Sequence, residues 1–148
     1  MRKIALLALL AFLAGCAAAP KPAGYGSFVT ASDAIDMKMV DDTVKKLVTL
    51  YPPANTRFEV QHSATDPFGT SLVATLREQG YALQEHMSAS TPDADDKGKS
   101  LTLAYVFDKP TGTDLYRVTL TIDTQNLSRV YLAKDGSVAP AGYWVRKE

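Results

Sequence analysis

The chain has 148 residues, with 16 Lys and Arg against 16 Asp and Glu, and it contains one cysteine. A chain of this length suits a single domain. The balanced charge argues against a nucleic-acid partner, which would require a basic patch, and a single cysteine excludes a disulfide within the chain. The fold must therefore be stabilised by its hydrophobic core.

The N-terminus has the pattern of an export signal. Arg2 and Lys3 precede an unbroken apolar run over residues 4–13, and the small residues Ala14 and Gly15 lead to Cys16. A secretory signal has a basic start, an apolar stretch of roughly 7–15 residues and small residues at the cleavage point. The run is too short to span a membrane comfortably, because a spanning helix needs about 20 apolar residues. The alternatives are an ordinary signal peptide with a chance cysteine and a short membrane anchor.

The segment Leu13-Ala14-Gly15-Cys16 resembles the lipobox of bacterial lipoproteins. The resemblance implies that residues 1–15 are a lipoprotein signal peptide, that Cys16 receives a diacylglycerol thioether, and that the new amino group is acylated, as with palmitate. This covalent lipid on Cys16 is the only cofactor-like group expected. Ala17, and not Asp, follows Cys16, which by resemblance to enterobacterial sorting favours the outer membrane, with the domain in the periplasm.

The stretch after Cys16 is small, contains Pro and Gly, and lacks periodicity. We expect residues 16–30 to be the lipidated N-terminus and a flexible tether. Residues 31–148 are then a single α+β periplasmic domain. Residues 27–29 (Ser-Phe-Val) fit two interpretations, either the first contact of the domain or a docking element.

A first amphipathic helix is predicted over residues 32–50, with Ser32 as its cap and Pro52-Pro53 as its stop. The opposite face carries charges, which we interpret as solvated, with i,i+4 pairs from Asp41 to Lys45 and from Asp42 to Lys46. The apolar residues at helical spacing are Ile35, Met39, Val40, Val44, Leu47, Val48 and Tyr51.

Alternation over residues 56–62 predicts a half-buried strand. Asp66 and Pro67 have the character of a helix N-cap and first helical position, and Gly80 suits the left-handed residue that follows a helix. Residues 81–85 read as the next strand. The predicted buried stripe of this second helix is Phe68, Leu72, Val73 and Leu76.

The last third of the chain alternates as strands over residues 100–108, 115–122, 127–133 and 138–145, joined by turns. Pro140 and Gly142 place the final strand at a sheet edge. The order is α-β-α-β-β-β-β. This order predicts an α+β two-layer sandwich, a mostly antiparallel sheet of about five or six strands with two amphipathic helices on one face.

No catalytic or metal-binding pattern is found. His62 and His86 lack ligand spacing, there is no G-x-S-x-G elbow or glycine-rich phosphate loop, and the acidic loop at residues 88–99 lacks the calcium-loop register. We therefore expect no catalytic residue, no metal and no small-molecule substrate. A hydrolase would need a polar pocket that the sequence does not indicate.

One cluster near the C-terminus fits two interpretations. Its aromatic and Arg composition is favoured at protein interfaces, and an edge strand beside it can accept a partner strand. The alternative is that Trp144 closes the core. The residues of this possible interface are Arg129, Tyr131, Tyr143, Trp144 and Arg146.

The whole chain resembles the TrbH family of conjugal-transfer lipoproteins. The resemblance lies in the lipobox and in the stretches YGSFV, DDTVKKLVTLYPPANTRFE, DPFGTSLVATLREQGYAL, LYRVTL and PAGYWVRKE. It implies a non-enzymatic outer-membrane scaffold of a conjugative type IV secretion (mating-pair formation) apparatus for plasmid transfer. Its partners would be the membrane, through the lipid, and other secretion-channel proteins. The alternative is a periplasmic regulator or binding module, such as an activator of a cell-wall enzyme, which rests on fold analogy alone.

Overall fold

The computed structural model of the protein describes residues 24–85 and 100–148. Cys16, His86 and the predicted loop at residues 88–99 lie outside these ranges. The elements in chain order are β1 (Gly26–Ser27), α2 (Asp33–Leu50), the 3-10 helix η2 (Pro53–Asn55), β2 (Arg57–Val60), α3 (Pro67–Glu78), β3 (Ala82–Glu85), β4 (Ser100–Asp108), β5 (Leu115–Ile122), β6 (Gln125–Lys134), β7 (Ser137–Pro140) and β8 (Val145–Lys147).

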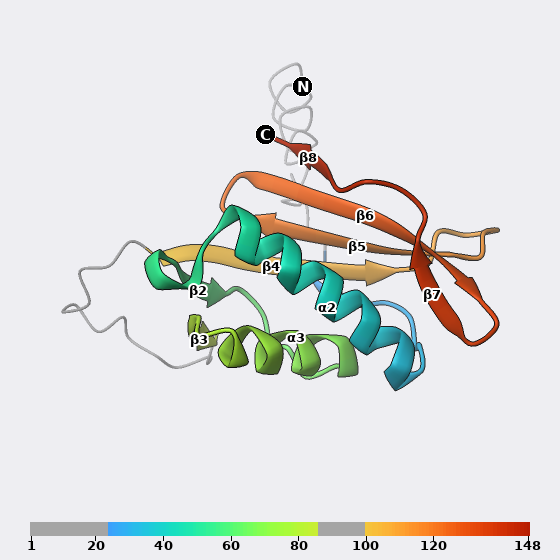
Figure 1. Cartoon of the computed structure of the whole chain (residues 1–148), viewed down its shortest axis with the longest axis horizontal. Helices are drawn as coiled ribbons and strands as arrows, with labels where there is room; N and C mark the ends of the chain where they lie inside the picture. Colours follow the sequence, from blue (N-terminus) through green and yellow to red (C-terminus); the bar gives the residue numbers. More distant parts are fainter. Residues whose placement is uncertain (1–23, 86–99) are drawn as a thin grey trace, which may run out of the picture.

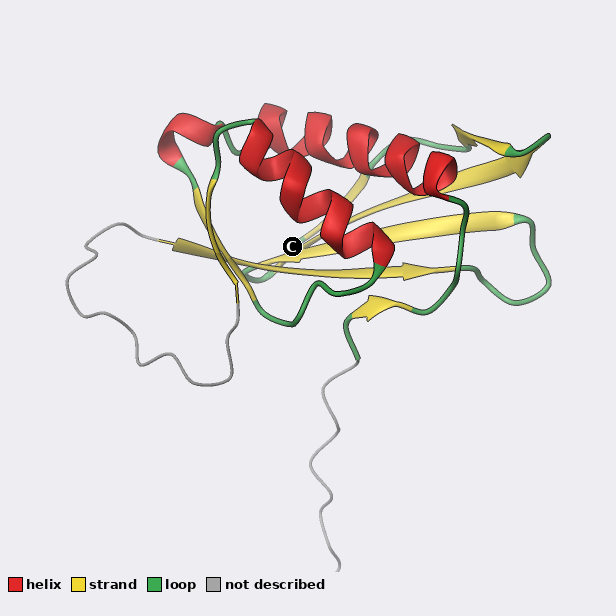
Figure 2. Ribbon diagram, turned by 90° about the horizontal axis from the view of Figure 1, so that it is seen from below, coloured by secondary structure: helices red, strands yellow, loops and turns green. Residues whose placement is uncertain are grey.

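The elements form two layers, with α2 and α3 side by side on one face of a single sheet (Figures 1 and 2). The sheet order is β3-β2-β4-β5-β6-β7, with β1 also paired to β4 and β8 also paired to β6. The pairs from β4 to the C-terminal edge are all antiparallel. The predicted α+β two-layer architecture, mostly antiparallel with two helices on one face, is confirmed.

The N-terminal side of the sheet is parallel. β2 lies between β3 and β4 and runs parallel to both. Parallel neighbours need a crossover, usually a helix, and α3 supplies it between β2 and β3. The succession of strands in the sequence did not reveal this mixed arrangement, because alternation predicts which face a strand buries but not its neighbours.

The sheet begins earlier than residue 31, where we placed the start of the domain. Gly26 and Ser27 pair in parallel with Val106 and Phe107 of β4, and the Phe28 amide donates to the Phe107 carbonyl at 2.8 Å. β2 pairs with β4 only as far as Leu103, so the rest of that edge is open to β1. Of the two interpretations of residues 27–29, the structure therefore shows contact with the domain.

The predicted final strand over residues 138–145 is split. Tyr131 of β6 pairs with Pro140 of β7, whereas Ser128 pairs with Val145 of β8. Four residues, 141–144, thus lie opposite two residues of β6. This is a bulge in the edge strand, which bends the strand and redirects its side chains.

The helix boundaries follow the predicted local signals. Asp66 caps α3 by accepting a hydrogen bond from the Gly69 amide at 2.9 Å. Gly80, which follows the helix, has a φ of +88°. Asp135 and Gly136 form the turn of the last hairpin, as predicted, with φ of 53° and 71°. The two predicted helical stripes and the inward faces of the strands form one core. It is made of Ile35, Met39, Val40, Val44, Leu47, Phe58, Phe68, Leu72, Leu76, Tyr81, Leu103, Tyr105, Phe107, Val118, Leu120, Ile122, Leu127 and Tyr131.

Candidate functional site

The structure divides the five residues of the possible C-terminal interface into two groups. Arg129, Tyr131 and Trp144 are turned toward α2, and Tyr131 is only 1% exposed. Tyr143 is 93% exposed, and Arg146 is exposed and paired with Glu148 at 3.0 Å. Aromatic and Arg composition alone could not separate these two groups.

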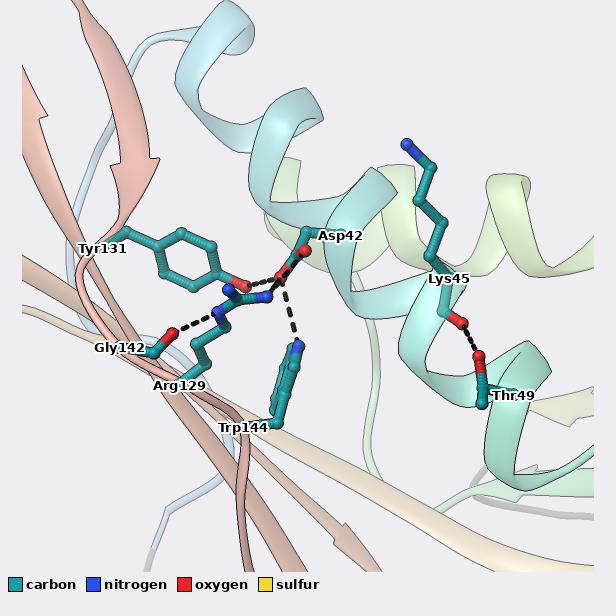
Figure 3. A network of polar contacts seen from close by, with 7 residues as sticks. All are labelled: Asp42, Lys45, Thr49, Arg129, Tyr131, Gly142 and Trp144. Atoms are coloured by element: carbon teal, nitrogen blue, oxygen red, sulfur yellow. Dashed lines mark hydrogen bonds and ion pairs between the residues drawn. The ribbon is translucent and has the colours of Figure 1, made fainter.

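Asp42 of α2 joins the inward group (Figure 3). Nη1 of Arg129 lies 2.8 Å from both carboxylate oxygens of Asp42. The Tyr131 hydroxyl donates to Oδ2 at 2.7 Å, and the Trp144 indole N–H donates to the same oxygen at 3.2 Å. We call these four residues the Asp42 cluster.

The prediction that Asp42 belongs to a solvated face paired with Lys46 is wrong. The side chains of Asp42 and Arg129 are only 28% and 17% exposed. A carboxylate at this depth needs a cation and hydrogen-bond donors to offset its lost hydration. Those donors come from β6 and from the bulge, 87 or more positions away in the chain, so no helix-local pattern could reveal them.

The Asp42 cluster also fixes the bulge. Nε of Arg129 donates to the Gly142 carbonyl at 2.9 Å, and the Ala141 amide donates to the Val130 carbonyl at 2.9 Å. The bulge backbone is thereby bonded to β6 while Trp144 packs half-buried against the core. Tyr143, between Gly142 and Trp144, is left in solvent.

The hydrogen bonds of the Asp42 cluster hold parts of the domain together. Burial and the hydrogen bond to Asp42 raise the pKa of Tyr131, so its hydroxyl stays protonated and donates to the carboxylate. The carboxylate itself is bound by three donor side chains. The arrangement holds the edge strand to α2 and displays Tyr143.

A second polar cluster lies at the start of α3. Oδ2 of Asp66 accepts hydrogen bonds from the Tyr105 hydroxyl at 2.5 Å and from the Ser27 amide at 3.3 Å. A Cβ on Gly69 would lie 1.8 Å from the Tyr105 hydroxyl oxygen, so only glycine leaves room for this contact. Asp66 thus ties β1, α3 and β4 together.

His62 lies beside this cluster and packs against two tyrosine rings. The centroid of its ring lies 5.5 Å from that of the stacked Tyr25 ring and 4.5 Å from that of the Tyr105 ring. Its Nε2 accepts the Tyr105 amide at 3.4 Å, and burial lowers its pKa. Within residues 24–85 and 100–148, no group of three His, Cys, Asp or Glu side chains could hold a metal ion.

Asp36 is a buried carboxyl that the helical stripe did not reveal. It is 3% exposed, and its Oδ1 has no hydrogen-bond partner. Burial first, and then the charges of Asp33 and Asp66, raise its pKa from 3.8 to about 6. The residue is therefore a source of pH-dependent stability.

An open groove of about 360 Å³ lies between α2 and α3. Its lining mixes apolar and polar side chains without a convergent reactive group, and it consists of Asp41, Val44, Lys45, Val48, Thr49, Thr75 and Gln79. Among the described residues, neither helix has the length and apolar character needed to cross a bilayer.

The described part of the chain is thus a small α+β domain whose polar clusters serve its own packing. A family model described as "Conjugal transfer protein TrbH" matches residues 22–148. The chain belongs to the TrbH family, which implies a role in conjugal transfer and, in general, a non-enzymatic kind of protein. Searches of curated proteins and of solved structures found no match.

We predict that Asp42→Asn lowers the free energy of unfolding by about 2 kcal/mol, because it leaves the half-buried Arg129 without its counter-charge. Urea unfolding followed by Trp144 fluorescence measures the change. Asp41→Asn, on the exposed side of the same helix, is the control and should shift stability by less than about 0.5 kcal/mol. A cycle with Arg129→Met should give a coupling energy of at least about 0.5 kcal/mol; additive losses would contradict the pairing.

A pH dependence follows from Asp36. Between pH 3.8 and about 6 the folded state holds a proton that the unfolded state has lost, so this stabilising contribution is present below pH 3.8 and disappears as the pH rises through 6. Asp36→Asn cannot ionise. Its stability relative to the wild type should therefore rise by on the order of 2 kcal/mol from pH 4 to pH 7, measured by urea unfolding. Parallel pH profiles for the two proteins would refute the assignment.

Proposed function

We propose that this TrbH-family protein is a non-enzymatic outer-membrane lipoprotein that scaffolds the envelope-spanning channel of a conjugative type IV secretion apparatus. The family match carries the link to conjugal transfer. The lipobox around Cys16 supports the anchor, and Ala17 supports the outer membrane as its location. The domain is held in the periplasm at that membrane, where channel proteins assemble.

The C-terminal edge is the surface that we assign to a channel protein. β7 and β8 pair only with β6 among the described strands, so the backbone groups on their other side are available to a partner. Tyr143 stands in solvent on a bulge that Arg129 and Gly142 fix. An aromatic side chain on a fixed backbone contributes contact area at low entropic cost, as binding hot spots do.

The anchor is tested by complementing a strain whose conjugative element lacks this gene. The wild-type gene should restore plasmid transfer and place the protein in the outer-membrane fraction. Cys16→Ser removes the acceptor of the lipid, so the protein should leave the membrane fraction and transfer should fall toward the level of the deletion strain. Transfer frequency and sucrose-gradient fractionation are the measurements.

Cys16→Ala is the matched second variant, since it removes the same thiol without adding a hydroxyl. Either variant retained on the outer membrane as before would refute the anchor. Transfer that is unchanged by the deletion would refute the role in the channel.

The edge is tested with Tyr143→Ala and its control Met37→Ala, a 45% exposed apolar residue on α2. Tyr143→Ala should weaken capture of channel proteins from detergent-solubilised membranes by about tenfold, or ~1.4 kcal/mol, without lowering the thermal midpoint. Met37→Ala should leave capture unchanged. Equal capture by both variants, or capture of cell-wall synthases in place of channel proteins, would contradict the assignment and support a regulatory role.

A further inference from the structure

The face of the sheet opposite α2 and α3 is covered by no element of the described chain (Figure 2). At one end of this open face lie three neighbouring apolar side chains of β5 and β6, and a fourth follows β1 on the other side of Asp108 and Arg117. They are Phe28, Leu115, Val130 and Leu132, and we call them the apolar strip.

Strand register shows how these residues lie relative to one another. Leu115 of β5 lies opposite Leu132 of β6, and Val130 lies opposite Arg117, whose other neighbour is Asp108 at the end of β4. Phe28 follows β1 at the level of Asp108, since Ser27 pairs with Phe107. Side chains alternate between faces along each strand, so Leu115, Val130 and Leu132 fall on the side away from the buried Phe107. Phe28 comes directly after β1 and is exposed beside this face.

The apolar strip is exposed, and the charges within it are already paired. Phe28 is 60% and Leu132 44% exposed, and Leu115 and Val130 are half-buried. The Arg117 guanidinium binds the Asp108 carboxylate through two hydrogen bonds of 3.0 and 2.5 Å. Covering these apolar side chains therefore removes their area from water while Arg117 and Asp108 stay paired with each other.

The chain enters the domain on this same side. Figure 2 shows the short described segment ahead of β1 turning to the side of the sheet away from the helices. Residue 24, where the described chain begins, is eight positions after Cys16 (24 − 16 = 8). Eight residues span at most about 29 Å when fully extended. A lipid on Cys16 therefore keeps residue 24, at the start of the described domain, within that distance of the bilayer.

We propose that the apolar strip rests on the phospholipid surface that holds the Cys16 anchor, so that the helices face away from the membrane. This inference rests on the lipid anchor of the proposed function. Phe and Leu side chains are among those that interfacial segments bury at the boundary of headgroups and acyl chains, and a covalent lipid adds to this binding. The short tether makes this contact effectively intramolecular.

The test uses the full lipidated protein in vesicles of phosphatidylethanolamine and phosphatidylglycerol. The Cys16 sulfur is a thioether in this protein, so an introduced cysteine is the only free thiol. Phe28→Cys and Leu132→Cys report on the apolar strip after labelling with the polarity-sensitive dye NBD. Met37→Cys on α2 and Tyr143→Cys on the bulge are matched controls at exposed positions.

Labels at positions 28 and 132 should show blue-shifted emission and quenching by spin-labelled lipids, and labels at 37 and 143 should show neither. Water-like emission at both 28 and 132 would overturn the proposal, as would a shift that depends on protein density in the vesicles, which indicates a second copy on the strip. Labelling of the wild-type protein reveals a free Cys16, and in that case the lipid anchor fails and the proposal fails with it.

Discussion

A carboxylate between a helix and the edge of a sheet requires several hydrogen-bond donors at once. In this domain, the arrangement of the C-terminal third follows from that requirement. Arg129, Tyr131 and Trp144 reach the oxygens of Asp42 from β6 and from the bulge. The Arg129 guanidinium also donates a hydrogen bond to the Gly142 carbonyl. Half-buried ion pairs add little net stability when their desolvation is counted, but they specify one arrangement over others because a misplaced partner leaves a buried charge. Here the specified arrangement is a split edge strand with an exposed tyrosine.

The sequence predicts well whatever depends on neighbouring residues. The helical stripe from Ile35 to Leu47, the cap at Asp66 and the turn at Asp135-Gly136 are all determined by periodicity or by backbone conformation within a few positions. The two-layer architecture follows, because amphipathic helices must cover an apolar sheet face. These features account for the correct fold class.

Other features depend on contacts between distant positions, and the sequence could not reveal them. β2 is parallel to both of its neighbours, β3 and β4, with α3 as the crossover to β3, while its own alternation fits any pairing. Asp42 was assigned to a solvated face because Lys46 lies four residues away, and Arg129 lies 87 residues away. The interface residues were grouped by composition. The bulge, however, directs Tyr143 into solvent and its neighbour Trp144 toward α2. Buried Asp36 shows the same limit, since an acidic residue in a first helical turn normally faces water near the positive helix end.

The strand order has a consequence for how the chain acquires its structure. β1 and β2 precede β4, with which both pair, and α2 and α3 precede the antiparallel strands β4 to β6 at residues 100–134. A chain made from its N-terminus therefore presents the apolar stripes of α2 and α3 before any covering surface exists. The antiparallel strands from β4 to β8 join through short turns and can pair as soon as they emerge, whereas β1 must wait for a partner about 80 residues later. The first two-thirds of the nascent chain must consequently be protected from aggregation until the last third arrives.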